Sequence, residues 1–141
     1  MNKLIIEKEI LKHNVAVIKK HAGETPVMGI VKCNGYGLGL IEYSKLLLEY
    51  GVDLLGVSAY EEAIALRDSG IECEIVLLTP YSEEDILKEL LERNIILTVA
   101  SVTSAKAVEN AGVLWTYPQK KVLLGWKDFN LIRVLTLMAT L

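Results

Sequence analysis

A lysine at the end of an apolar run, followed by closely spaced glycines, is the segment of this sequence whose residue types could do chemistry. Lys32 ends the run VMGIVK at 27–32, and Gly35, Gly37 and Gly39 follow it. An ammonium group at the end of a buried strand is costly to desolvate, so burial favours the neutral amine. A neutral lysine amine is nucleophilic and can form a Schiff base with a carbonyl cofactor.

The glycine-rich stretch after Lys32 is suited to a phosphate group. Glycines let backbone N–H groups approach a phosphate, and a helix expected from Leu40 adds the positive end of its dipole. Tyr36 lies within this stretch and can offer its hydroxyl to the phosphate or to the cofactor. The alternative is a strand-end lysine whose ammonium reaches solvent before an ordinary glycine loop. The residues by themselves leave both interpretations open.

Strands alternating with helices are predicted to position this segment over residues 1–110. Apolar runs predict strands at 27–32, 53–57, 74–78 and 95–100, and helical spacing predicts helices at 9–21, 40–50, 60–69, 82–93 and 102–110. Ser82, with Asp85 three positions later, forms a variant of the capping box and predicts a helix start. Units of roughly 20 to 25 residues indicate a parallel sheet with right-handed crossovers.

Two architectures fit this alternation. One is an open, doubly wound sheet, and the other is part of an eight-stranded α/β barrel. Both place chemistry at the carboxyl ends of the strands, where Lys32 is found. The periodicity does not choose between them.

Composition and charge exclude several classes of protein. Of the 141 residues, 52% are hydrophobic, which is enough for a core and excludes a disordered chain. The net charge of −3 shows no basic surface of the kind that binds nucleic acid. No signal peptide is recognisable, and no stretch approaches the roughly 18 apolar residues of a membrane span. The two cysteines and two histidines match neither a disulfide framework nor a zinc spacing. We therefore expect a cytoplasmic protein with no metal, membrane or nucleic-acid partner.

The composition changes after Asn110. Residues 1–110 carry 11 Lys/Arg and 17 Asp/Glu, a net charge of −6. Residues 111–141 carry four Lys/Arg against Asp128 alone, a net of +3, and hold both tryptophans and the one phenylalanine. The alternation of elements also fails there, with Val122–Leu124 as a candidate short strand. We therefore divide the chain into 1–110 and 111–141.

The segment VKCNGYGLG at 31–39 resembles the pyridoxal-phosphate lysine motif of alanine racemases, a Val-Lys-Ala-Asn/Asp-Ala-Tyr-Gly-x-Gly string. Cys33 and Gly35 stand at its two alanine positions, and both replacements are small. The blocks LGVSAYEEA (55–63), LRDSGI (66–71) and IVLL (75–78) resemble the segments that follow in the family. The resemblance covers residues 1 to about 110 and identifies them as the N-terminal half of the family's barrel domain.

This resemblance implies both a fold and a reaction. The fold is α/β, a partial TIM-like (β/α)8 barrel with about four to five βα units of the fold-type III pyridoxal-phosphate barrel. In the family a β-rich C-terminal domain follows, and the enzyme is a homodimer. Lys32 would hold pyridoxal 5'-phosphate as an aldimine and act as a catalytic base, and Tyr36 would bind the cofactor phosphate. The family is an isomerase that interconverts L- and D-alanine for D-alanine biosynthesis, so an amino acid, with alanine as the default, is the expected substrate.

Racemisation needs a proton-transfer group on each face of the substrate, and the resemblance supplies only Lys32. The family's opposite tyrosine, C-terminal domain and fifth-strand Asp-Thr-Gly-Met-x-Arg block have no counterpart here. We therefore expect a truncated chain with weak or no activity alone. The alternatives are a pyridoxal-phosphate-binding domain without racemase activity, and a non-catalytic remnant that self-associates to cover its open edges.

The last 31 residues have two explanations. A shifted reading of the codons of residues 125–129 permits Met-Glu-Arg-Phe, which is compatible with the Met-x-Arg-Phe of the family. Our hypothesis is that the reading frame is lost somewhere after Asn110 and that the stretch from there to Leu141 is out-of-frame translation. The alternative is a genuine short variant whose tail caps the open sheet.

Overall fold

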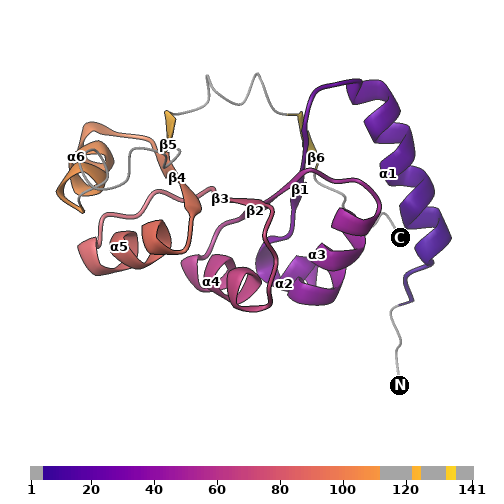
Figure 1. Ribbon diagram of the computed structural model, residues 1–141, viewed down its shortest axis with the longest axis horizontal. Coiled ribbons are helices and arrows are strands. Elements are labelled where there is room, and N and C mark those ends of the chain that lie inside the picture. The colour runs from indigo at the N-terminus through magenta and orange to yellow at the C-terminus, as the bar shows by residue number, and fades with distance from the viewer. Residues whose placement is uncertain (1–4, 112–121, 125–132, 136–141) are drawn as a thin grey trace.

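The computed structural model describes residues 5–111, and the backbone of 122–124 and 133–135. Figure 1 shows the arrangement of the elements. In chain order they are α1 (Lys8–Ala22), β1 (Val27–Ile30), α2 (Lys32–Tyr36), α3 (Leu40–Glu49), β2 (Leu54–Val57), α4 (Tyr60–Asp68), β3 (Glu74–Leu77), α5 (Glu84–Glu92), β4 (Ile95–Val99), α6 (Val102–Asn110), β5 (Val122–Leu124) and β6 (Arg133–Leu135).

The strands form one parallel sheet in the order β5-β4-β3-β2-β1-β6. Strands β1 to β5 lie side by side in chain order, without the reversal that defines a doubly wound sheet. Helices α3 to α6 lie along one side of the curved sheet (Figure 1). This single winding is that of a TIM-like barrel, and it confirms the predicted partial barrel over the open, doubly wound alternative.

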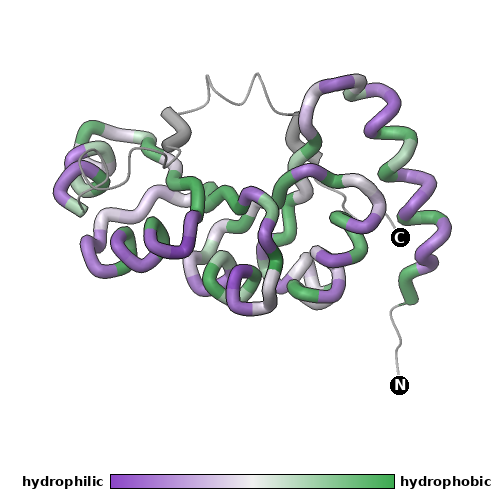
Figure 2. The backbone as a smooth tube through the Cα atoms, in the orientation of Figure 1, coloured by the Kyte–Doolittle hydropathy of each residue, from purple (hydrophilic) through white to green (hydrophobic). Residues whose placement is uncertain are grey.

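The two faces of the sheet pack into separate apolar clusters. The larger cluster lies between the sheet and the helices, and it joins strand residues such as Leu55, Ile75 and Leu97 to Leu66 of α4 and Leu90 of α5. Each such buried leucine contributes about 1.5–3 kcal/mol. Figure 2 shows the matching pattern, with apolar strands and helices of mixed polarity.

The second cluster occupies the opposite, concave face of the sheet. It consists of Met28, Ile30, Leu54, Val76 and Ile96, with the partly buried Tyr36 and Leu78 packed against it. Along each strand these residues alternate with those that face the helices, as the period of two along a strand requires. Strands buried on both faces read as continuous apolar runs, which explains the pattern from which they were predicted.

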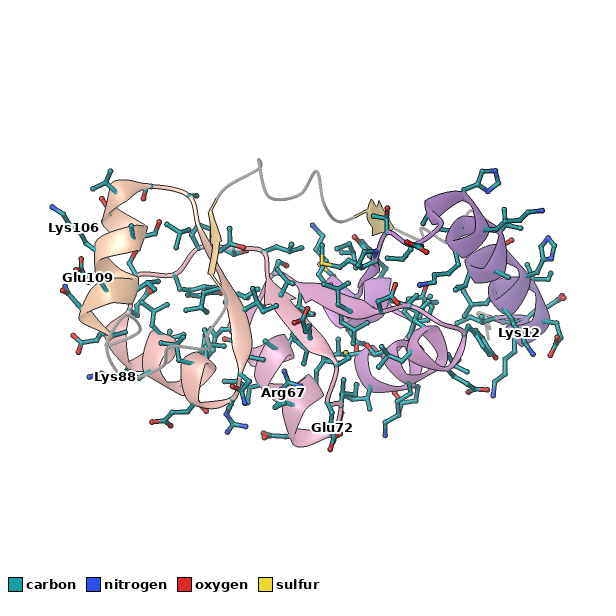
Figure 3. The ribbon with its side chains drawn as sticks, turned by 45° about the horizontal axis from the view of Figure 1, so that its top comes forward. Lys12, Arg67, Glu72, Lys88, Lys106 and Glu109 are labelled. Carbon is teal, nitrogen blue, oxygen red and sulfur yellow. The ribbon has the colours of Figure 1, made fainter. Side chains whose placement is uncertain are left out.

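Arg67 of α4, labelled in Figure 3, joins its own helix to the loop that precedes β3 and to the loop that precedes β4. Its guanidinium donates to the carbonyl oxygens of Ile71 (2.7 Å) and Cys73 (3.0 Å), which lead into β3. It also donates to those of Arg93 (2.9 Å) and Asn94 (3.0 Å), which follow α5. Partial burial lowers the pKa of Arg67, although an arginine remains charged.

The predicted helices and strands are confirmed, with ends displaced by one or two residues. The prediction that Ser82 opens a helix with Asp85 as its capping partner is wrong. Helix α5 begins at Glu84, so Glu83 occupies the N-cap position, and no side chain caps the helix. The Ser82 amide instead donates to the Glu83 carboxylate (3.0 Å). The physical reason is that Ser82 lies one residue too early to reach the first free N–H groups of the helix.

A capping box is present at the start of α6 instead. The Ser104 amide donates to Ser101 Oγ (3.1 Å), and the Ser101 amide donates to Ser104 Oγ (3.0 Å). Serine here replaces the Glu or Gln of the usual pattern, which is why the pattern was not recognised.

The two strands that the structure describes within residues 111–141 belong to the sheet. The candidate strand Val122–Leu124 is confirmed as β5, which pairs with β4 in parallel register from Leu97 with Val122. β6 pairs with β1, on the side away from β2. The division of the chain at residue 110 stays a prediction. None of the helices within the described ranges is long and apolar enough to cross a membrane.

Candidate functional site

The chain leaves β1 through a left-handed turn, α2. Cys33 (φ 55°, ψ 51°), Asn34 (φ 54°, ψ 46°) and Gly35 (φ 62°, ψ 36°) all have left-handed backbone angles, and Tyr36 has a φ of 55°. Left-handed helical conformation costs roughly 1–2 kcal/mol per non-glycine residue. Strain of this kind persists only where the surroundings enforce it, and it concentrates at functional sites. The strained backbone therefore indicates a functional role for residues 33–36, directly after Lys32.

Hydrogen bonds within the turn occupy the backbone N–H groups of its glycines. The Gly35 amide donates to the Val31 carbonyl (2.9 Å), the Gly37 amide to that of Cys33 (3.2 Å), and the Gly39 amide to that of Asn34 (3.0 Å). The expectation that these N–H groups face a phosphate is therefore wrong, because each already donates inside the turn. The glycines serve instead to form the turn.

Asn34 connects this turn to two helices. Its side-chain Oδ1 accepts from the Leu40 amide (2.9 Å), so it caps the first turn of α3. The start of α3 was predicted to face a phosphate, but its first N–H group, that of Leu40, already donates to Asn34. The Asn34 amide donates to Glu62 Oε1 (2.9 Å), which lies in the first turn of α4.

Lys32 was predicted as the last residue of the first strand, but β1 ends at Ile30 and Lys32 is the first residue of α2, two residues beyond the carboxyl end of β1. Its side chain is partly buried. Within residues 5–111 no carboxylate pairs with its ammonium and no acceptor bonds to it. An amine at the carboxyl edge of a parallel sheet, with its donors unused, has the position and the chemistry of a carbonyl-binding lysine.

Tyr36 lies at the other end of the same turn. It is partly buried and packs against the apolar cluster of the concave face. Next to it, Tyr43 of α3 is 3% exposed, and burial raises the pKa of Tyr43, with a smaller contribution from Tyr36. The described residues offer the Tyr36 hydroxyl no hydrogen bond, so it is available to an outside acceptor.

This donor set fits pyridoxal phosphate at two points. An amine with no partner matches the carbonyl end of the cofactor, and a phenolic hydroxyl with no hydrogen bond matches its phosphate. The turn brings Lys32 and Tyr36 to one edge of the sheet. Among the residues described here, no group of three or more His, Cys, Asp or Glu could hold a metal ion.

The hydrogen bond between Glu62 and the Asn34 amide was not predicted from the sequence. Glu62 lies in the LGVSAYEEA block (55–63), one of the segments that resemble the family. A carboxylate at the start of a helix is usually explained by the helix dipole, so nothing in the pattern linked it to Asn34, 28 residues earlier.

Comparison with known proteins gives consistent matches. The model of the family described as "Alanine racemase, N-terminal domain" matches residues 6–124. The alanine racemase of Methanococcus maripaludis is 40% identical over 105 residues, which cover 74% of this chain and 28% of that protein. The alanine racemase of Fusobacterium nucleatum is 43% identical over 97 residues, 69% of this chain and 27% of that protein.

Solved structures agree with these matches. Alanine racemase from Oenococcus oeni superposes with a TM-score of 0.67 at 34% identity, over 74% of this chain and 30% of that one. A histidine racemase from Leuconostoc mesenteroides gives a TM-score of 0.70 at 28% identity, over 78% of this chain and 29% of that one. This chain therefore spans less than a third of the length of these relatives.

Proposed function

Because the chain belongs to the alanine racemase family, with residues 6–124 matching its N-terminal domain, we propose that it is the lysine-bearing part of a pyridoxal-phosphate-dependent amino-acid racemase. Its cofactor-binding residues are Lys32 and Tyr36, and Lys32 is also the catalytic residue. The proposed substrate is alanine. The similarity to a histidine racemase keeps other amino acids within the range to be assayed.

When bound, pyridoxal phosphate supplies an electron sink that stabilises negative charge at the α-carbon of an amino acid. Lys32 Nζ would hold the carbonyl end of the cofactor, and the same amine would take or return the α-proton on one face of the substrate. The Tyr36 hydroxyl would donate to the cofactor phosphate. The left-handed turn fixes the backbone between these two side chains.

The observation that carries this proposal is the strained turn directly after an unpaired, partly buried lysine. Cys33, Asn34 and Tyr36 all have positive φ there, at a substantial cost in free energy. An ordinary glycine loop after a surface lysine has no need of such a backbone. The turn supports the functional interpretation of Lys32 over that of a lysine whose ammonium simply reaches solvent.

Cofactor addition tests the proposal. Pyridoxal phosphate added to the full chain should produce a visible absorbance band, and Lys32→Ala should abolish it. Lys45→Ala is the matched control, since Lys45 is an exposed lysine on neighbouring α3. A band of unchanged size in Lys32→Ala would overturn the assignment of Lys32, and the absence of any band in the unsubstituted chain would support the non-catalytic remnant.

We also infer a cytoplasmic, self-associating protein. Cys33 and Cys73 are free thiols, which is typical of a reducing compartment. Within the described residues the sheet is open at its two edge strands, β5 and β6, and unpaired strand edges favour association with a second copy. Sedimentation of the purified chain tests this, with a species of twice the monomer mass or more as the expected result.

For the tail, we infer that the reading frame is lost after the barrel sequence. The family match to residue 124 favours a loss near that residue over one directly after Asn110. The nucleotide sequence tests this inference. An intact family-like frame downstream would support it, and the absence of such a frame would favour a genuine short variant.

A further inference from the structure

A carboxylate from α4 reaches the left-handed turn. Glu62 lies in the first turn of α4, and its Oε1 accepts from the Asn34 amide at 2.9 Å. Its Oε2 is buried and has no hydrogen-bond partner within the described part of the chain. A buried carboxylate oxygen without a partner is costly, so the side chain gives up solvation to keep this geometry.

The Asn34 amide needs a partner from outside the turn. The first intra-turn bond runs from the Gly35 amide to the Val31 carbonyl, so the amides before Gly35 have no partner of this kind. The same deficit exists at the start of any helix. Glu62 satisfies the Asn34 amide with a charge-assisted bond, which is roughly twice as strong as a neutral one.

The neighbouring carboxylate shows that the helix dipole does not by itself explain this contact. Glu61 is exposed, and its charge raises the pKa of Tyr60 next to it. Both acids lie in the first turn of α4 and both suit its dipole. Only Glu62 is bonded to the strained segment.

We propose that Glu62 is a positioning residue, whose carboxylate holds the left-handed turn and so sets the placement of Lys32 relative to Tyr36. The proposal rests on the proposed function in one respect, because Lys32 and Tyr36 are assigned there as the cofactor-binding pair. Glu62 acts through the backbone of Asn34, which lies between Lys32 and Tyr36 in the chain.

Amide hydrogen exchange in the full chain tests the positioning role directly. In Glu62→Ala the Asn34 amide should exchange about tenfold faster, as expected for loss of a hydrogen bond to a charged group. The Leu78 amide, which donates to the Val57 carbonyl between β3 and β2 (2.8 Å), is the distant reporter and should be unchanged. Glu62→Gln retains an acceptor and should restore slow exchange at Asn34, and Glu61→Ala should exchange like the unsubstituted chain.

Three outcomes would overturn the proposal. They are unchanged exchange at Asn34 in Glu62→Ala, equal acceleration at Leu78, and failure of Glu62→Gln to restore protection. The last would show that charge near the helix end, not the acceptor, is what matters. If Glu62→Ala does not fold, Glu62→Asp takes its place, since it keeps the charge but shortens the reach, and the same acceleration at Asn34 is expected.

Cofactor binding supplies an independent readout. The apparent Kd for pyridoxal phosphate, from visible absorbance, should rise about tenfold in Glu62→Ala and stay unchanged in Glu61→Ala. An unchanged Kd in Glu62→Ala would contradict a positioning role toward the cofactor. If the unsubstituted chain binds no pyridoxal phosphate, the proposed function fails, while the exchange experiment still decides whether Glu62 holds the turn.

Discussion

Asn34 has two tasks at the site, because it occupies a left-handed position and caps α3 through its side chain. Asparagine tolerates positive φ better than most residues, since its short polar side chain bonds locally. Its neighbours Cys33 and Tyr36 share the left-handed backbone without that advantage. Asn34 therefore both suits the left-handed backbone and ties the turn to α3.

Replacing Asn34 with alanine should destabilise the chain by about 1–2 kcal/mol. The substitution removes the acceptor for the Leu40 amide and puts a residue that disfavours positive φ into the turn. Urea unfolding measures the change. Asn34→Asp is the control, because aspartate also accepts from an amide and also tolerates positive φ. Equal losses in both variants would contradict this account.

The two cysteines should differ in reactivity. Cys33 is exposed, whereas burial raises the pKa of the Cys73 thiol, an effect that Arg67 only partly offsets. A raised pKa keeps the thiol protonated to higher pH, so less of the reactive thiolate is present near neutrality. Iodoacetamide at pH 7 should modify Cys33 first, as read by peptide mass spectrometry, and the preference should narrow as the pH rises. Both should react at similar rates in urea, and faster labelling of Cys73 in the folded chain would count against this prediction.

At the scale of elements, the fold depends on a few side chains that tie consecutive βα units together. Arg67 is the clearest of these, because four backbone carbonyls from two different loops accept from its guanidinium. Asp53 has a similar role at the same, amino-terminal end of the parallel strands, where it precedes β2 and contacts the first residue of β1. Its Oδ2 accepts from the Val27 amide and from Lys19 of α1, both at 2.6 Å.

Arg67→Ala should cost about 3 kcal/mol, because partly buried carbonyls lose a charged donor. Arg67→Lys should recover little of this loss, since an ammonium cannot reproduce the planar fork. Arg93→Ala is the matched control. Arg93 pairs with Asp68 and Glu89 at the surface, and such pairs contribute about 0–1 kcal/mol. Thermal or urea unfolding would refute the argument if Arg93→Ala proved as damaging as Arg67→Ala.

At the scale of the whole molecule, the sheet is part of a barrel, and its concave face holds an apolar cluster beneath the proposed site. The proposed function gives this chain one proton-transfer group, Lys32, near the carboxyl edge of this sheet. This chain covers less than a third of the family members compared above. The rest of their fold lies in sequence that this chain does not match.

We therefore expect the chain alone to bind pyridoxal phosphate but to racemise alanine at least about a hundredfold more slowly than a full-length family member, since a positioned acid or base contributes about 10²–10⁴ in rate. A circular-dichroism or coupled-enzyme assay with L-alanine measures this, with a full-length family enzyme as the control. Robust turnover by the 141-residue chain would contradict it.

The sequence by itself determined the elements and the position of the lysine. Apolar runs and helical spacing are local patterns, so the strands and helices of residues 1–110 other than α2, and the place of Lys32 near the carboxyl end of the first strand, followed from neighbouring residues alone. Only the tertiary structure decided between the barrel and the doubly wound sheet, because strand order depends on which distant segments pair. It also decided the backbone of residues 33–36, since residue type does not state the sign of φ. That turn is bonded to a carboxylate 28 residues away, a contact between segments that come together only when the chain folds.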